Sequence, residues 1–208
     1  MPRRDQLFQE LDGDDRFGVL LLAQLDAVPE TLQFIVTTTR LDPVTGGFRD
    51  VGQYIVRAIG VAEHRLTLGL FTKALIKEDH PLLYQYNSAP VGLFFRGQPD
   101  DVNALFSDVL QAYASTFGPW RQPPTYLNTS KPLISLLASG GDLAGQMPKP
   151  LAENLAQAME SHGLETRAMA EPTPSEDEHG RSRLRKVLLM DESYIVAFDF
   201  TIEVLGKV

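Results

Sequence analysis

Residues 193–205 read SYIVAFDFTIEVL, and they carry the clearest alternation of apolar and polar side chains in the chain. On an extended backbone successive side chains point to opposite faces, so residues two apart share a face. The apolar positions on one face are Tyr194, Val196, Phe198, Phe200, Ile202 and Val204, and the polar positions opposite are Asp199, Thr201 and Glu203. This pattern predicts a strand with one buried face, as in an antiparallel sheet that is covered on one side.

The sequence before this stretch supplies the expected partners of the strand. Residues 184–190 form a second apolar run, and Asp191-Glu192 between the two runs predicts a hairpin turn. Nearer the N-terminus, residues 32–38, 53–59 and 65–70 also read as strands with short links. Short links indicate antiparallel pairing. We therefore expect an N-terminal three-stranded meander and a C-terminal hairpin.

The most regular helical pattern lies between these two groups of strands. Residues 102–117 place apolar side chains at helical spacing without a gap. Asp100 or Asp101 can cap the start of this helix, and Gly118-Pro119 ends it. Shorter helices are expected over residues 4–11, 130–137 and 148–163. Residues 17–25 fit either a further helix or a buried strand.

Strands and helices that occur in separate runs favour an α+β fold over a parallel βαβ fold. The sequence therefore predicts one α+β domain over residues 1–208, with a mainly antiparallel sheet and three helices packed on one face. Further strands are expected at residues 91–95 and 164–170. Residues 171–182 are polar and charged, and this composition predicts a mobile loop.

The chain has 208 residues, a net charge of −8 and no cysteine. The negative charge disfavours binding to phosphate backbones, and the lack of cysteine favours a cytoplasmic compartment. The first residues contain no apolar signal-peptide core. The longest apolar run, Val19–Ala23, is too short to cross a membrane. We therefore expect a cytoplasmic protein without a membrane partner.

One basic stretch departs from the overall charge. Residues 181–186 read RSRLRK and lead into a predicted strand. Positive side chains in this arrangement can follow phosphates, so weak nucleic-acid binding is the second alternative function. The preceding acidic residues, Glu176–Glu178, oppose this interpretation because they can pair with the arginines. Charged residues of this kind also protect the edge of a sheet.

The motifs that would indicate a cofactor or a metal are incomplete. Residues 140–145 resemble a phosphate-binding loop, but Gln146 and Met147 stand where Lys and Ser or Thr are needed. Residues 12–23 lack the Gly and Glu that a calcium loop requires. No two of the four histidines have the spacing of a metal site. We therefore expect no cofactor and no metal, and we interpret Gly140-Gly141 as a helix end followed by a turn.

Two clusters combine a histidine with carboxylates, and their members are the catalytic candidates. One cluster holds Glu63 and His64, and the other holds Glu78, Asp79 and His80. A nearby carboxylate can orient an imidazole for acid–base chemistry. The first alternative function is therefore a small-molecule-binding protein or an enzyme with a dispersed site. A solvated turn is the simpler interpretation of each cluster, and at opposite ends of one strand they would lie roughly 40 Å apart.

The strongest binding candidates lie in two proline-containing aromatic stretches, residues 81–87 and 119–126. Trp, Tyr and Arg are enriched at the hot spots of protein interfaces, and loops often carry function. The candidates are Tyr84, Tyr86, Trp120, Arg121 and Tyr126. The competing interpretation is that these side chains pack over the edge of the sheet. The sequence thus favours a non-catalytic binding or assembly module that contacts a protein partner or forms a homodimer.

Overall fold

The computed structural model describes residues 3–25, 28–123, 125–170 and 184–207. It has mixed α and β structure with mostly antiparallel sheets, which confirms the predicted class. Its contacts group into two compact units, which we call the first unit (Met1–Asp79 with Leu184–Val208) and the second unit (His80–Arg183). Each unit has a hydrophobic cluster of its own. The single domain over residues 1–208 stays a prediction. The expected mobile loop at residues 171–182 lies outside the described residues.

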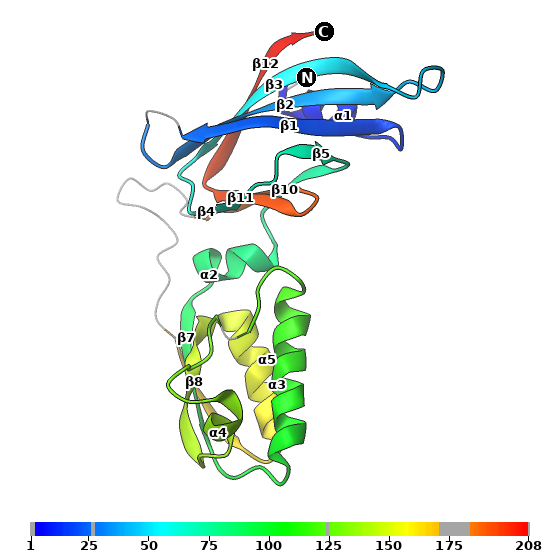
Figure 1. The fold of residues 1–208 in the computed structure, drawn as a ribbon. Helices are drawn as coiled ribbons and strands as arrows, with labels where there is room; N and C mark the ends of the chain where they lie inside the picture. The colour runs from blue at the N-terminus through cyan, green and yellow to red at the C-terminus, as the bar shows by residue number, and fades with distance from the viewer. Residues whose placement is uncertain (1–2, 26–27, 124, 171–183, 208) are drawn as a thin grey trace. The chain divides into compact units, whose positions relative to one another are not determined.

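The first unit contains a five-stranded antiparallel sheet with the order β12-β3-β2-β1-β5 (Figure 1). Its strands are β1 (Arg16–Leu25), β2 (Thr31–Leu41), β3 (Phe48–Ile59), β5 (Gly69–Phe71) and β12 (Asp199–Lys207). The side chains of Tyr54, Val56 and Ala58 are buried on one face of β3. The intervening Ile55 and Arg57 are only partly covered. The sheet therefore has one closed face, as the alternation in the sequence predicts.

A four-stranded sheet with the order β4-β11-β10-β6 completes the β-structure of the first unit. Its strands are β4 (Glu63–Arg65), β6 (Ala74–Lys77), β10 (Lys186–Met190) and β11 (Ser193–Ala197). One buried cluster joins both sheets with the N-terminal helix α1 (Arg3–Glu10), through residues such as Leu7, Phe34 and Ile195. The core of the first unit therefore involves both sheets and the helix.

Residues 193–205, the stretch with the clearest alternation, contribute to two strands that belong to different sheets. β11 pairs with β10 and β4, whereas β12 pairs with β3, so the chain changes sheets at Phe198. The Phe198 N–H donates to the Ile59 carbonyl at 2.9 Å. Its ring covers Gly60, where a Cβ atom would lie 2.2 Å from a ring carbon. Gly60 has φ +66, in the left-handed region that favours glycine.

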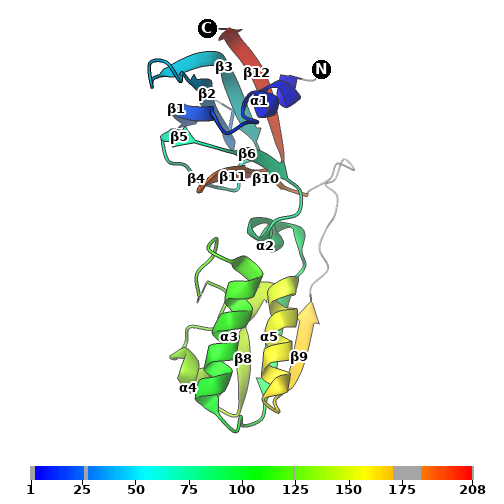
Figure 2. The ribbon, with the colours of Figure 1, turned by 90° about the vertical axis from the view of Figure 1, so that its right-hand side faces the viewer.

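The second unit is a three-stranded antiparallel sheet with helices on one face (Figure 2). The sheet order is β8-β7-β9, with β7 (Pro90–Arg96), β8 (Gly141–Pro148) and β9 (Glu165–Ala170). The helices are α3 (Val102–Phe117), α4 (Leu133–Leu137) and α5 (Lys149–Ser161), preceded by the short η1 (Pro81–Leu83) and α2 (Tyr84–Asn87). Figure 2 shows α3 and α5 side by side in front of the sheet. Their buried faces meet the inner face of β7 in one cluster that includes Leu93, Leu105 and Leu155.

The start and end of α3 follow the expected signals. The Asp101 carboxylate accepts hydrogen bonds from the N–H groups of Asn103 and Ala104, at 2.9 and 3.1 Å. An N-cap of this kind satisfies donors that have no partner within the helix. The helix ends at Gly118, whose φ is +55. The Asp101 cap and Gly118 end are the features that the sequence indicated.

Residues 17–25, which fit either a helix or a strand by sequence, form strand β1 and pair with β2. Several other expected elements differ from the structure. Residues 65–70 do not form the third strand of a meander, since β4 pairs with β11 and β5 pairs with β1. Gly141 opens strand β8 instead of lying in a turn. The helices α3, α4 and α5 pack with the sheet of the second unit, where the sequence analysis placed them on the main antiparallel sheet. In the described ranges, no helix has the length and apolar character needed to cross a membrane.

Candidate functional site

The two aromatic stretches that the sequence singled out lie together in the second unit. The Phe117 ring, at the end of α3, stands between them. Its centroid lies 6.2 Å from that of Tyr84 in α2 and 5.5 Å from that of Tyr126. The Tyr126 hydroxyl also donates to Gln85 Oε1 at 2.6 Å. We call Tyr84, Tyr86, Trp120, Arg121 and Tyr126 the aromatic cluster.

Tyr113, in the last turns of α3, holds the loop that follows the helix. The Tyr113 hydroxyl donates to the Gln122 carbonyl at 3.1 Å, and its ring lies 5.1 Å from that of Phe117. Burial raises the pKa of the Tyr113 hydroxyl, so it keeps its proton and remains a donor. Tyr113 thus fixes the path of the loop that carries Trp120 and Arg121.

His80 belongs with the aromatic cluster and not with the carboxylates that precede it in the sequence. Its ring lies 5.1 Å from the Trp120 ring in an edge-to-face arrangement. Its Nδ1 accepts a hydrogen bond from the Leu82 N–H at 3.3 Å, which caps η1. Nδ1 is therefore the acceptor nitrogen of the ring in this cap. His80 is 8% exposed, so the interpretation of this position as a solvated turn is wrong for His80.

The five side chains of the aromatic cluster are all partly buried. They are neither fully packed in the core nor fully exposed, so each of the two competing interpretations describes part of their surroundings. Partial burial restricts the rotamers of the rings and leaves part of each ring accessible. Aromatic side chains that are held in this way lose little conformational entropy when they bind a partner.

The cluster is attached to strand β8 by a close backbone contact. Leu127 forms an isolated β-bridge with Gly145, and the Asn128 N–H donates to the Ala144 carbonyl at 2.8 Å. A Cβ atom at Gly145 would lie 2.1 Å from the Tyr126 carbonyl oxygen. The sequence does not indicate this role, because Gly140-Gly141 and the glycine that follows them fit a helix end and a turn.

The four other catalytic candidates lie in the first unit. Glu63 and His64 are on β4, and Glu78 and Asp79 follow β6. These are the two edge strands of the four-stranded sheet. The register aligns Glu63 with Lys77 across β11 and β10. Three strand spacings place these two positions roughly 14 Å apart. The separation of roughly 40 Å expected for the two clusters is therefore too large. The distance still excludes a direct hydrogen bond between them.

The local contacts of these four residues differ from one another. The Glu63 carboxylate accepts a hydrogen bond from the Tyr194 hydroxyl at 2.6 Å. Glu78 Oε1 lies 3.5 Å from Lys186 Nζ. His64 and Asp79 are exposed. Each of these surroundings agrees with a surface role, and the assignment of the residues to catalysis stays a prediction.

The described part of the basic stretch makes contacts within the first unit. Arg185 donates to the Gly60 carbonyl and stacks over the Phe198 ring, 4.1 Å from its centroid. Lys186 Nζ lies 3.4 Å from Asp199 as well as near Glu78. Residues 181–183 lie outside the described residues. These contacts give Arg185 and Lys186 a place at the point where the chain changes sheets.

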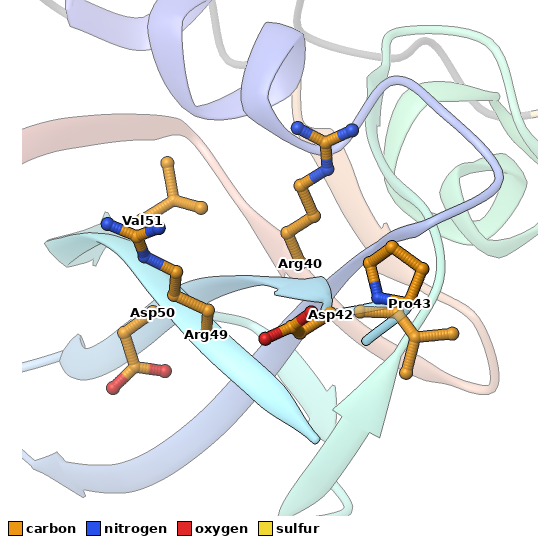
Figure 3. A pocket seen from close by; sticks show the side chains of 7 residues that line it. Arg40, Asp42, Pro43, Arg49, Asp50 and Val51 are labelled. Carbon is orange, nitrogen blue, oxygen red and sulfur yellow. The ribbon is translucent and has the colours of Figure 1, made fainter. Parts of the chain in front are cut away.

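One cavity, of about 540 Å³, opens at the turn between β2 and β3 (Figure 3). Arg40 and Arg49 occupy opposite positions on the two strands, and Figure 3 shows their side chains rising on the same side. The Val44 N–H donates to the Asp42 carboxylate at 2.9 Å and helps to lower the pKa of that carboxyl. Arg40 also pairs with Asp15. The cavity is thus rimmed by charges of both signs.

A larger cavity, of about 880 Å³, lies between the end of α1 and the link from β5 to β6. Apolar side chains such as Phe8, Leu11 and Leu75 line it together with the charged Arg16 and Lys73. Volumes of this size are typical of small-molecule sites. Neither this cavity nor the one at the β2–β3 turn is lined by any of the ten candidate residues from the sequence.

Sequence reasoning also missed the partner of His162. The ring Nε2 lies 2.7 Å from Asp108 Oδ2, which links the end of α5 to the middle of α3. Asp108 lies outside the apolar stripe of α3, and nothing in the sequence around it indicates a contact with His162. Searching the described residues finds no group of three or more His, Asp or Glu side chains that could hold a metal ion.

Comparison with known proteins adds no further assignment, because no family model, no curated protein and no solved structure matches the chain.

Proposed function

We propose that this protein is a non-catalytic binding module that contacts a protein partner through the aromatic cluster of the second unit. The observation that carries the proposal is the convergence of two stretches that are about thirty residues apart in the sequence. They meet around Phe117 and are joined by the hydrogen bond from Tyr126 to Gln85. Tyr84 and Tyr126 contact the same Phe117 ring, and Trp120 contacts His80 next to the first stretch.

The chemistry of these residues supports a protein partner. Trp, Tyr and Arg dominate the binding energy of protein interfaces, and they do so when neighbouring contacts hold them in place. Trp120 is supported by His80, and Tyr126 is supported by both Phe117 and Gln85. A surface that is ordered before binding loses less entropy on association.

The proposal is tested by quantitative capture from native lysate with the immobilised chain and with its Trp120→Ala variant. We expect proteins that bind the wild type to be depleted at least tenfold on the variant. Phe48→Ala is the matched control, because Phe48 is a 52% exposed aromatic side chain in the first unit. The control should retain all of these proteins. Equal capture by wild type and Trp120→Ala would reject the proposal.

Thermal unfolding of Trp120→Ala separates a binding role from a packing role. A binding residue can be truncated at little cost to stability. A loss of about 3–5 kcal/mol, as for a large aromatic side chain in a core, would instead identify Trp120 as a packing residue. That outcome would remove the anchor of the proposed interface.

A second candidate function is the binding of a small molecule in the 880 Å³ cavity of the first unit. The favouring observation is the combination of apolar walls with the charged side chains of Arg16 and Lys73. A thermal-shift screen with metabolites, nucleotides and cofactors tests it. A ligand present at 100 times its Kd stabilises a fold by about 2.7 kcal/mol. A shift that is lost in Leu75→Glu, which places a charge on the cavity wall, would support this function over the first.

A further inference from the structure

The two edge strands of the sheet in the second unit, β8 and β9, differ in what covers their outer backbone groups. On the outer side of β8, residues 127–128 add a β-bridge to Gly145 and a hydrogen bond to the Ala144 carbonyl. The Asn128 side-chain amide also donates to the Leu143 carbonyl at 3.0 Å. On the other edge, β9 pairs with β7 alone among the residues that the structure describes. No described strand occupies the outer side of β9, and the backbone groups there can pair with another strand.

β9 differs from the other edge strands in the described parts of the chain. β4, β5 and β6 have three or four residues each, and β12 contains a register shift next to Gly206. Short strands and bulges are the devices by which proteins prevent pairing at an edge. β9 has six residues, contains no proline and keeps an unbroken register with β7. Five of its six residues are exposed.

The outward face of β9 carries two opposite charges. Glu165 and Arg167 are two residues apart and therefore lie on the same face. Arg167 is the partner of Phe94, which is 38% exposed, so this face points away from the helices. Both charged side chains are exposed, and within the described ranges neither has an ion pair.

Charge selects one arrangement when two copies of β9 pair antiparallel. In such a pair, residues directly opposite each other share a face, and like charges in opposite positions are destabilising. A two-fold axis at Arg167 would place two arginines opposite each other. An axis at Ala168 would place Arg167 opposite Met169 and leave it without an opposite charge. An axis at Thr166 places Glu165 of each copy opposite Arg167 of the other.

We propose that β9 pairs antiparallel with β9 of a second copy of this chain, with Thr166 at the two-fold axis. In this register the overlap is limited to residues 165–167 of each β9, because residues 162–163 belong to the turn that ends α5. This overlap joins the two three-stranded sheets into one six-stranded sheet and forms two reciprocal Glu165–Arg167 ion pairs. Most homodimers have this two-fold symmetry, in which one surface patch meets itself. The interface uses no residue of the aromatic cluster, so it stands independently of the proposed function.

The register gives a direct test, because the natural sequence contains no cysteine. In an antiparallel pair the two Cα atoms at the axis lie about 4.5–5.5 Å apart, within the range of a disulfide bond. We expect Thr166→Cys to form a covalent dimer under mild oxidation, seen by non-reducing electrophoresis. Ala170→Cys is the control, since the two copies of residue 170 would lie roughly 26 Å apart and should not cross-link.

A charge exchange tests the ion pairs in solution. Sedimentation velocity should show wild type shifting from 23.1 kDa towards twice that mass as concentration rises. Glu165→Arg and Arg167→Glu should each weaken the dimer at least tenfold, and the double variant, which exchanges the charges, should restore it. Circular dichroism checks that each variant keeps its fold. If either single charge-reversal variant fails to fold, the comparison of cross-linking in Thr166→Cys and Ala170→Cys tests the proposal on its own.

The outcomes that overturn the proposal are equally distinct. A monomer at every concentration that also fails to cross-link through Thr166→Cys excludes the β9 interface. A dimer that survives both single reversals, or that cross-links equally through Ala170→Cys, is held together elsewhere on the chain. Trp120→Ala should leave the β9 dimer unchanged, so loss of the dimer in that variant would assign self-association to the aromatic cluster instead.

Discussion

Gly145 lies directly against the carbonyl oxygen of Tyr126, so close that a Cβ atom at this position would stand 2.1 Å from the oxygen. Real Cβ atoms do not approach other atoms so closely, and the neighbour is backbone, which cannot rotate away. The contact sets how closely the segment 126–128 lies on β8. It therefore also sets where the Tyr126 ring stacks on Phe117.

Replacement of Gly145 by alanine should displace this segment and cost about 1–3 kcal/mol of unfolding free energy, in the range of backbone clashes in a packed region. Urea denaturation measures the cost. Gly92→Ala is the control, because it lies on the neighbouring strand β7 and its Cβ would meet nothing closer than 3.5 Å. Gly92→Ala should change stability much less. Equal effects at the two glycines would show that the Tyr126 contact has no special role.

The residue types of the aromatic cluster could be predicted from the sequence, but the contacts that hold these side chains in place could not. Trp120, Tyr126 and Tyr84 stand out in the sequence because their residue types are enriched at interfaces. Their fixed positions depend on contacts between residues far apart in the chain, such as Tyr126 with Gln85 and Tyr126 with Gly145. No local pattern records such contacts, so the sequence left open whether the rings were exposed or packed.

A second close approach, in the first unit, predicts a coupled pair of substitutions. A Cβ atom at Gly18 in β1 would lie 2.1 Å from the ring of Phe71, which is only 5% exposed. Gly18→Ala should therefore lower the unfolding free energy by about 1–3 kcal/mol, as for an overpacked core. In a Phe71→Leu background the added methyl group has more room, and the same substitution should cost less. Additive costs in the double variant would exclude the clash as the cause.

The fold was predictable where one face of an element is buried and the other is not. The alternation in β12 and the helical spacing of α3 both arise in this way, because the buried stripe follows the period of the backbone. β11 is buried at all of its residues, so alternation carries no information there, and the change of sheet at Phe198 was not predictable. The division into two units was also hidden, because the first unit is formed by two segments that the second unit separates in sequence.

The contact between His162 and Asp108 predicts measurable coupling between α5 and α3. Their side chains are 18% and 48% exposed and lie 2.7 Å apart. A double-mutant cycle with His162→Ala and Asp108→Ala should give a coupling energy of about 0.5–1 kcal/mol. The control pair is Lys149 and Glu153, which are 3.5 Å apart and more than 60% exposed. Its coupling should be near zero, and a His162–Asp108 coupling that is equally small would contradict the link.

The phenol of Tyr54 predicts a loss of stability at alkaline pH. Tyr54 is fully buried on β3. Burial raises the pKa of its hydroxyl far above the ordinary value of 10.0, and the neighbouring Glu10 raises it further. The Glu10 carboxylate is itself held by Thr38, whose hydroxyl donates to it at 2.7 Å. A negative charge on Tyr54 would therefore be formed beside another negative charge and away from water.

The sign of the effect follows from where the proton is released. In the unfolded chain Tyr54 loses its proton near pH 10, whereas in the folded protein it keeps the proton to higher pH. Above the unfolded pKa the unfolded state therefore binds fewer protons, and the unfolding free energy falls as pH rises, by at most about 1.4 kcal/mol per pH unit for this group. Tyr54→Phe removes the titrating group from both states. Urea denaturation from pH 8 to about 11 should show that the wild type loses stability faster than Tyr54→Phe above about pH 10. Parallel curves of unfolding free energy against pH for the two proteins would show that Tyr54 titrates in the same way in the folded and unfolded states.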